Sequence, residues 1–139
     1  MSGQVRVGVD LTAISEVAES IRTFGDRYVR RVFTDHEDSC SQGSDAVRAS
    51  HLAGRFAAKE ATLKVLRPAE DRPPWRSIEV VQDPSGACSI RLVGRAAEMA
   101  AAAGLQNLAV SFTHHADLAC AVVVGQIGAH RGLRRKGPR

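Results

Sequence analysis

The chain has 139 residues, which is enough for one domain with a hydrophobic core and too few for two. Hydrophobic residues make up 44% of it and charged residues 24%, as in ordinary soluble globular proteins. No apolar stretch approaches the roughly 20 residues that a membrane-spanning helix needs, so we expect no membrane partner. The N-terminus enters an apparent strand almost at once, which is not typical of a signal peptide, and we expect a cytoplasmic protein.

The net charge of +4 comes from one end of the chain. Residues 130–139, HRGLRRKGPR, hold five Lys or Arg and no acid, which leaves 14 basic against 15 acidic residues elsewhere, or about −1. We therefore expect a single domain over residues 1–127 and a disordered basic tail over 128–139. We interpret the tail as a solubilising end, with contact to an acidic partner as the alternative. A near-neutral body with 4% aromatic residues argues against a nucleic-acid-binding module.

The cysteines indicate neither a disulfide framework nor a zinc site. Cys40, Cys88 and Cys120 are odd in number and widely spaced, and no C-x-x-C pair occurs. We expect free thiols, which fit an intracellular compartment.

The first half of the chain predicts one strand and three helices. Valines that alternate with other residues indicate the strand, and apolar residues at helical spacing indicate the helix that follows and ends at Gly25. A capping-box pattern, Thr34-Asp35-His36-Glu37, indicates a short helix, and the longest helix ends before Pro68. The expected elements are a strand over about 5–11, helices over about 14–24 and 45–66, and a short helix that begins near 34.

The second half predicts a hairpin, a helix and two further strands. Asp83-Pro84-Ser85-Gly86 forms a turn between two apolar runs, and an Ala-rich segment ends at Gly104. The expected elements are strands over 78–81 and 89–92, a helix over about 95–103, and strands over 108–113 and 118–124. Together they predict an α+β fold with an antiparallel sheet packed on a long central helix.

Four charged residues are candidates for chemistry, although each also has an ordinary interpretation. Asp10 lies at the end of an apolar strand, where a carboxylate is usually a turn or capping residue. Glu60 lies at the edge of the apolar stripe of the long helix, and with Lys64 it has the spacing of a surface ion pair, worth on the order of a few tenths of a kcal/mol. Lys59 falls on the stripe itself, so its ammonium group must reach solvent or find an anion.

Five motifs give these residues a common context. The most specific is the helix motif LAGRFAAKEA, with Lys64 four residues beyond its glutamate. The motifs are Gly8-Val9-Asp10, Val32-Phe33-Thr34-Asp35-His36-Glu37, residues 52–61, Trp75-Arg76-Ser77-Ile78-Glu79-Val80, and Ser111-Phe112-Thr113-His114 with the strand ending at 119–123. In this order and spacing, over about residues 5–125, the chain resembles the holo-acyl-carrier-protein synthase family of one-domain 4′-phosphopantetheinyl transferases.

The resemblance implies the 4′-phosphopantetheinyl transferase fold and a transferase activity. Members of the family move 4′-phosphopantetheine from coenzyme A to a serine of an acyl carrier protein, with Mg²⁺ as cofactor. Asp10 and Glu60 would hold Mg²⁺ on the coenzyme A pyrophosphate, which suits a cation that takes a few carboxylates plus phosphates and waters. Asp10, Glu60 and Lys64 would be the catalytic residues. Glu60, or a water it orients, would help to deprotonate the serine, and Lys64 would face the phosphate.

The resemblance also implies further contacts and an assembly. The residues expected to contact coenzyme A are Arg48, Arg55, Lys64, Thr113 and His114. Family members form trimers with active sites between subunits, so we expect a homotrimer. The sequence leaves open whether the carrier belongs to fatty-acid or to polyketide biosynthesis.

The chain departs from the family pattern at three places. Ala13 and Glu16 occupy positions where the family usually has a glutamate and then an arginine facing the acidic carrier. Residues 67–74, RPAEDRPP, replace a Gly-rich stretch, and His115 replaces a common aspartate. Because complementary charge governs encounter, Glu16 puts carrier recognition in question. Nearby arginines that could substitute are Arg22, Arg27, Arg30 and Arg31.

One alternative within the same fold stays open. A catalytically impaired relative would still bind coenzyme A and act as an interaction module. The presence of all three catalytic candidates argues against it.

Overall fold

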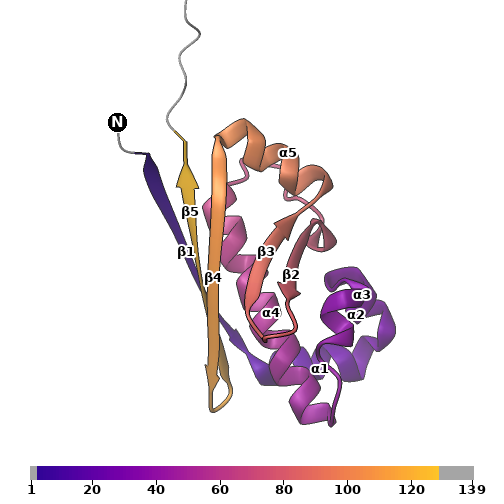
Figure 1. The fold of residues 1–139 in the computed structure, drawn as a ribbon. Helices are drawn as coiled ribbons and strands as arrows, with labels where there is room; N and C mark the ends of the chain where they lie inside the picture. The colour runs from indigo at the N-terminus through magenta and orange to yellow at the C-terminus, as the bar shows by residue number, and fades with distance from the viewer. Residues whose placement is uncertain (1–2, 129–139) are drawn as a thin grey trace, which may run out of the picture.

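A long helix, α4, runs along one face of a three-stranded sheet, and the other elements flank it (Figure 1). The computed structural model describes residues 3–128, so the tail predicted for 128–139 lies, apart from Gly128, outside the described residues. In chain order the elements are β1 (Gln4–Ala13), α1 (Ile14–Phe24), α2 (Asp26–Val32), α3 (Asp35–Ser39), α4 (Asp45–Leu66), the 3₁₀ helix η1 (Trp75–Ser77), β2 (Ile78–Gln82), β3 (Cys88–Leu92), α5 (Gly94–Ala103), β4 (Leu105–His115) and β5 (Leu118–Ile127). The predicted α+β fold is confirmed.

The strands form two antiparallel sheets rather than one. The larger sheet has the order β1-β5-β4, and the hairpin β2–β3 forms the smaller one. In the larger sheet, Asp10 of β1 and Phe112 of β4 pair with Ala121 of β5 from opposite sides. Asp10 and Phe112 are therefore aligned across the sheet and separated only by the central strand.

Some boundaries differ from those that the sequence predicts. β1 continues to Ala13, and β4 begins at Leu105 with a register irregularity before Asn107, so the polar residues there mask the strand pattern. α2 was not predicted: it has seven residues and follows α1 directly after Gly25, too short for a helical period to be visible in the sequence.

Close contact between α4 and β1 depends on small residues. Ala57, Ala58 and Ala61 are fully buried on the face of α4 that packs against the sheet. A Cβ atom on Gly8 would lie 1.9 Å from the carbonyl oxygen of Ala61, so no larger residue fits between strand and helix. This approach brings Asp10, two residues along β1, against the same helix.

A buried ion pair joins α4 to the elements on its other side. Lys59 Nζ lies 2.7 Å from Glu37 Oε1, and both side chains are fully buried. The ammonium group also donates hydrogen bonds to the carbonyl oxygens of Trp75, at 2.9 Å, and Ile78, at 2.5 Å. The expected anion for Lys59 is therefore Glu37. Burial lowers the pKa of Lys59, and the adjacent carboxylate opposes that shift.

Glu37 is held in turn by the predicted capping box. Its side chain accepts from the backbone N–H of Thr34 at 2.8 Å, while its own N–H donates to the Thr34 hydroxyl at 3.2 Å. Its second carboxylate oxygen accepts from the backbone N–H of Val80 in β2 at 2.9 Å. The network satisfies the buried carboxylate by hydrogen bonds as well as by charge.

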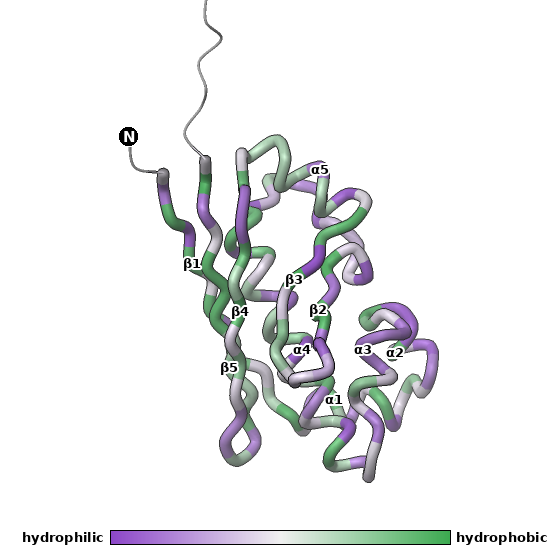
Figure 2. Tube along the Cα trace, viewed as in Figure 1, coloured by the Kyte–Doolittle hydropathy of each residue, from purple (hydrophilic) through white to green (hydrophobic). Residues whose placement is uncertain are grey.

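The face of the larger sheet that points away from α4 is apolar and uncovered within the chain. Figure 2 shows green, hydrophobic segments along β1 and β5. The large exposed hydrophobic residues on these strands are Val5, Val7, Val9, Leu11, Leu118 and Val122. Val7 retains 60% of its accessible surface and Leu11 63%, which is unusual for contiguous aliphatic side chains.

The cysteines are free thiols, as expected: Cys40, Cys88 and Cys120 form no disulfide in the described structure. Within residues 3–128, no helix is long and apolar enough to cross a membrane.

The buried pair generates a stability prediction. Lys59→Met should lower the free energy of unfolding by about 3–5 kcal/mol, because it leaves the Glu37 carboxylate buried without a counter-ion. Adding Glu37→Gln should recover part of that loss, because the buried charge is then removed. Urea denaturation of the single and double variants measures both effects. A Lys59→Met variant within about 1 kcal/mol of wild type would contradict the role given to the pair.

Candidate active site

Asp10, Glu60 and Lys64 lie together where β1 crosses α4. Asp10 Oδ2 accepts a hydrogen bond from the hydroxyl of Thr12 at 3.1 Å, and Lys64 Nζ lies 3.5 Å from Asp10 Oδ1. Lys64 also donates to the carbonyl oxygen of Val9 at 2.5 Å. The ordinary interpretations of these residues are therefore wrong: Asp10 is a strand residue facing the helix, and Lys64 pairs across to β1 rather than with Glu60.

The electrostatics of this group favour a bound cation. Partial burial raises the pKa of Glu60, and the neighbouring Asp10 carboxylate raises it further, whereas Arg72 and Lys64 oppose the shift. No ion pair within 4.0 Å compensates Glu60 among residues 3–128. The carboxylates of Asp10 and Glu60 thus act on each other as like charges, an arrangement that a divalent cation would relieve.

The donor set fits magnesium better than a transition metal. No group of three or more His, Cys, Asp or Glu side chains within the described part of the chain could enclose a metal ion. Mg²⁺ usually takes one or two protein carboxylates and completes its octahedron with phosphates and waters, so two carboxylates suffice if a phosphate ligand is present. Asp10 and Glu60 are therefore suited to hold Mg²⁺ only together with a phosphate-containing substrate.

A cavity of about 290 Å³ extends from this group beneath the loop that follows α4. Glu60, Lys64, Glu70 and Arg72 contribute charged side chains to its wall. Residues 67–74, which depart from the Gly-rich family pattern, thus bring a second cation, Arg72, near Glu60. Sequence reasoning did not single out Arg72.

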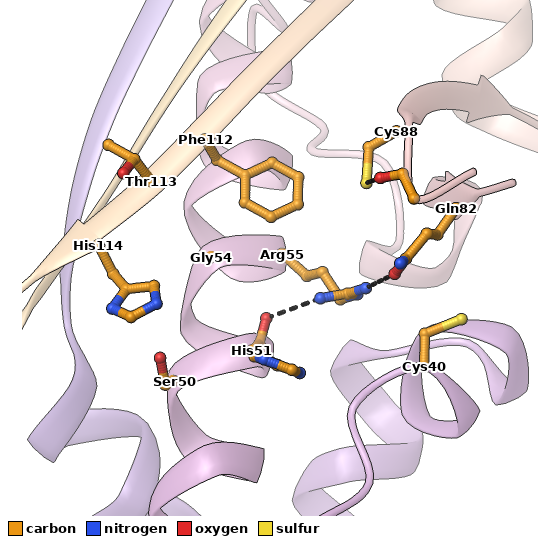
Figure 3. Close-up of a pocket in the computed structure, with 11 residues that line it drawn as sticks. Cys40, Ser50, His51, Gly54, Arg55, Gln82, Cys88, Phe112, Thr113 and His114 are labelled. Atoms are coloured by element: carbon orange, nitrogen blue, oxygen red, sulfur yellow. Dashed lines mark hydrogen bonds between the residues drawn. The ribbon is translucent and has the colours of Figure 1, made fainter. Parts of the chain in front are cut away.

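A second cavity, of about 320 Å³, lies on the hairpin side of α4 (Figure 3). The helix contributes Gly54 and Arg55, β4 contributes Phe112, Thr113 and His114, and the hairpin contributes Gln82, Gly86 and Cys88; Cys40, Ser50 and His51 complete the wall. A Cβ atom on Gly54 would lie 3.0 Å from the Phe112 ring, so this glycine keeps α4 and β4 in contact.

Arg55 is the strongest feature of this second cavity. It is only 3% exposed, and its guanidinium donates to Gln82 Oε1 at 2.7 Å and to the carbonyl oxygen of His51 at 3.2 Å (Figure 3). It also lies 5.9 Å from the centre of the Phe112 ring. Its Nε has no hydrogen-bond partner, and no carboxylate lies within 4.0 Å in the described part of the chain. A buried cation without a counter-ion indicates a binding site for an anion.

The predicted site residues thus fall into separate groups. Asp10, Glu60 and Lys64 lie together, and Arg55, Thr113 and His114 line the cavity on the hairpin side. Arg48 belongs to neither group, because it pairs with Asp38 at 3.1 Å and lines a groove between α1 and α4. The sequence motifs did not indicate Gln82, His51 or Cys88, since their role in the wall depends on how the hairpin packs against α4.

Known proteins match this chain over most of its length. The family model described as "4'-phosphopantetheinyl transferase superfamily" matches residues 6–123. A holo-[acyl-carrier-protein] synthase of Chloroflexus aurantiacus is 42% identical over 133 residues, covering 87% of this chain and 97% of its own. The synthase of Nitratidesulfovibrio vulgaris is 40% identical over 121 residues, covering 86% and 96%.

Solved structures agree with the sequence matches. The structure of the "Chronobacterium ammoniagenes ACPS-CoA complex" superposes with a TM-score of 0.80 at 32% identity, covering 91% of this chain and 99% of that one. The Helicobacter pylori holo-[acyl-carrier-protein] synthase in complex with coenzyme A gives a TM-score of 0.74 at 27% identity, with 86% and 98% covered. The family model, the sequence relatives and the solved structures agree, and the chain belongs to the 4′-phosphopantetheinyl transferase superfamily.

Proposed function

We propose that the chain is a cytoplasmic holo-[acyl-carrier-protein] synthase that transfers 4′-phosphopantetheine from coenzyme A to a serine of an acyl carrier protein, with Mg²⁺ as cofactor. The observation that carries the proposal is the pair of neighbouring carboxylates, Asp10 and Glu60, of which only Asp10 has an ion-pair partner, Lys64, among residues 3–128. Its relatives bear the name of this activity, and two of the similar structures are complexes with coenzyme A. The carrier would serve fatty-acid or polyketide biosynthesis.

The reaction joins the serine Oγ to the phosphorus of the phosphopantetheine group and breaks that phosphorus atom's bond to the leaving oxygen of adenosine 3′,5′-bisphosphate. Mg²⁺, held by Asp10 and Glu60, would neutralise charge on the pyrophosphate oxygens. The Lys64 ammonium, which lies against Asp10, would contact the transferred phosphoryl group as its negative charge shifts. Glu60, or a water bound to it, would receive the serine proton.

The nucleotide end of coenzyme A would occupy the cavity on the hairpin side of α4. Arg55 supplies a buried positive charge that no carboxylate neutralises, and His114 and Thr113 line the same cavity. A phosphate would accept hydrogen bonds from a guanidinium already held in place by Gln82 and His51. Binding at this end, away from the reacting bond, positions the substrate.

Two features support assembly into a homotrimer with shared sites. The catalytic group lies on the β1 side of α4 and the nucleotide cavity on the hairpin side, and they line different cavities of one chain. The apolar outer face of β1 and β5 has no cover within residues 3–128. Packing copies through this face would remove the exposed valines from water and could join the catalytic group of one subunit to the nucleotide cavity of the next.

The carrier would dock on the helices near the start of the chain. Glu16 is exposed in the first turn of α1, and α2 carries Arg27, Arg30 and Arg31 on its exposed surface. Arg30 pairs with Asp26 at 3.8 Å, so Arg27 and Arg31 would supply most of the positive charge that an acidic carrier helix requires. Because Glu16 is acidic, α1 would attract an acidic carrier less strongly than α2 does.

The metal proposal predicts that Asp10→Ala and Glu60→Ala each abolish transfer without loss of fold. Each variant removes one of the two carboxylates that we propose as Mg²⁺ ligands. Intact-protein mass of an apo carrier incubated with coenzyme A and Mg²⁺ reports transfer, and calorimetry reports Mg²⁺-dependent binding of coenzyme A. Glu98→Ala, an exposed carboxylate on α5, is the control. Wild-type turnover by Glu60→Ala would contradict the mechanism.

The assembly proposal predicts a particle of about 45 kDa, three times the 14.9 kDa chain. Val7→Glu should yield smaller species and lose activity at low protein concentration, because it places a charge in the proposed interface. Light scattering after size exclusion measures the mass. Val93→Glu, at an exposed valine outside the larger sheet, should stay trimeric. A wild-type monomer active at nanomolar concentration would refute shared sites.

The carrier proposal predicts that Glu16→Arg speeds modification of a generic acidic fatty-acid carrier. We expect KM to fall about three- to tenfold with little change in kcat, most clearly at low salt, because a peripheral charge acts on association. Glu98→Arg adds the same charge remote from α1 and should have no such effect. The natural carrier should gain less if its surface is adapted to Glu16. Unchanged kinetics and salt dependence for every carrier would show that Glu16 is not at the interface.

A further inference from the structure

Gln82, at the end of β2, is the only side chain within residues 3–128 that accepts a hydrogen bond from the Arg55 guanidinium. We propose that Gln82 is a positioning residue: it holds Arg55 with a neutral acceptor and so leaves the positive charge of the cavity available for a phosphate of the nucleotide. The inference rests on the proposed function, since it assumes that the cavity receives coenzyme A.

The geometry makes Gln82 the main constraint on Arg55. The bond from Arg55 Nη2 to Gln82 Oε1 is 2.7 Å long, and Figure 3 shows it crossing the cavity wall from α4 to the hairpin. The other bond, to the carbonyl oxygen of His51, is 3.2 Å and comes from one turn earlier in the same helix. Without Gln82, nothing outside α4 would fix the guanidinium by a hydrogen bond.

Gln82 is itself held firmly. Its backbone N–H donates to His36 Nε2 at 3.1 Å, and Gln82 is the register partner of Cys88 in the hairpin. His36 belongs to α3, the helix that also carries the buried Glu37. The amide oxygen therefore approaches Arg55 from a backbone position fixed on two sides.

The neutral character of the acceptor is unusual for a buried cation. The other buried cation in the described chain, Lys59, has a carboxylate 2.7 Å away. Arg55, at 3% exposure, has an amide instead. A glutamate at position 82 would have nearly the same shape and would form a charge-assisted pair with a guanidinium that is ionised at any ordinary pH.

Asp83, the acid adjacent to Gln82, forms no ion pair with Arg55 within 4.0 Å. Asp83, the next residue, accepts hydrogen bonds from the Ser85 N–H and hydroxyl and from the Ala87 N–H within the hairpin turn. Its exposed carboxylate is thus committed to the turn. The cavity combines a fixed guanidinium with the absence of a competing carboxylate at contact distance, which suits recognition of an anion.

The test separates charge from hydrogen bonding by two substitutions at one position. Gln82→Glu keeps a hydrogen-bond acceptor for Arg55 but neutralises the charge of its guanidinium. Gln82→Leu removes the acceptor and leaves the charge of Arg55 unchanged. The control is Gln106→Glu, which adds the same charge at the opposite end of β4 from Thr113 and His114. Calorimetry with adenosine 3′,5′-bisphosphate, without Mg²⁺ or carrier, measures binding of the nucleotide end alone, and thermal unfolding checks each fold.

We expect Gln82→Glu to weaken nucleotide binding about tenfold or more and Gln82→Leu only about threefold, because the lost phosphate contact is charge-assisted. Gln82→Glu should also flatten the salt dependence of binding and raise KM for coenzyme A with little change in kcat at saturation. Its melting temperature should not fall, since an ion pair replaces a neutral bond.

Three outcomes would overturn the inference. A merely structural role for Gln82 predicts the reverse order, in which Gln82→Leu binds adenosine 3′,5′-bisphosphate more weakly than Gln82→Glu does. Equal affinity for wild type, Gln82→Glu and Gln106→Glu would show that a neutral acceptor at position 82 does not matter for nucleotide binding. If wild type itself fails to bind adenosine 3′,5′-bisphosphate, the assignment of the cavity fails and the proposed function with it, whereas wild-type binding with unchanged variants sinks only the role of Gln82.

Discussion

The buried pair of Lys59 and Glu37 holds α4 against α3 and β2, and the positions of the site residues on α4 depend on this contact. A charged pair without water is tolerated only when both partners are close and fully hydrogen-bonded, so α3, α4 and β2 must meet at one place. This meeting fixes the rotation of α4. With Lys59 directed to the hairpin, Arg55 lies one turn earlier on the same face, and Glu60 and Lys64 follow on the face toward β1. The contact between Lys59 and Glu37 therefore orients both Arg55 and the pair of Glu60 and Lys64.

Two buried cations on one face of one helix show how a fold can separate stability from binding. Lys59 has its counter-ion within the chain, so its charge contributes to cohesion and is not available to a ligand. Arg55, four residues earlier, is equally enclosed but has only neutral acceptors. The energetic deficit of Arg55 in the free protein is what a bound phosphate would relieve. In the same way, a bound cation would relieve the repulsion between Asp10 and Glu60, which Lys64 and Arg72 offset only in part.

Local patterns predict the elements with clear periods or caps, and the family motifs single out Asp10, Glu60 and Lys64, which the structure places together. The α4 helix, the capping box at Thr34 and the hairpin were found because their signals lie within a few consecutive residues. The position of Lys59 on the apolar stripe predicts that its ammonium group reaches solvent or finds an anion, but the partner, 22 positions earlier, is identifiable only from the fold. Gln82 and Arg72 were missed for the same reason: glutamine and arginine carry no local signal, and only the packing of the hairpin and of residues 67–74 gives them neighbours.

The alternation of β1 links catalysis to assembly. Gly8, Asp10 and Thr12 point toward α4, where glycine permits the contact and the carboxylate meets Lys64, while Val7, Val9 and Leu11 point outward. Because successive strand residues face opposite sides, a shift of one residue would turn the valines toward the helix and Asp10 toward the apolar surface. Ten consecutive pairs between β1 and β5 hold that register. The strand that presents Asp10, the proposed metal ligand, therefore presents the apolar face as well, and burying this face against other subunits would stabilise the register on which the position of Asp10 depends.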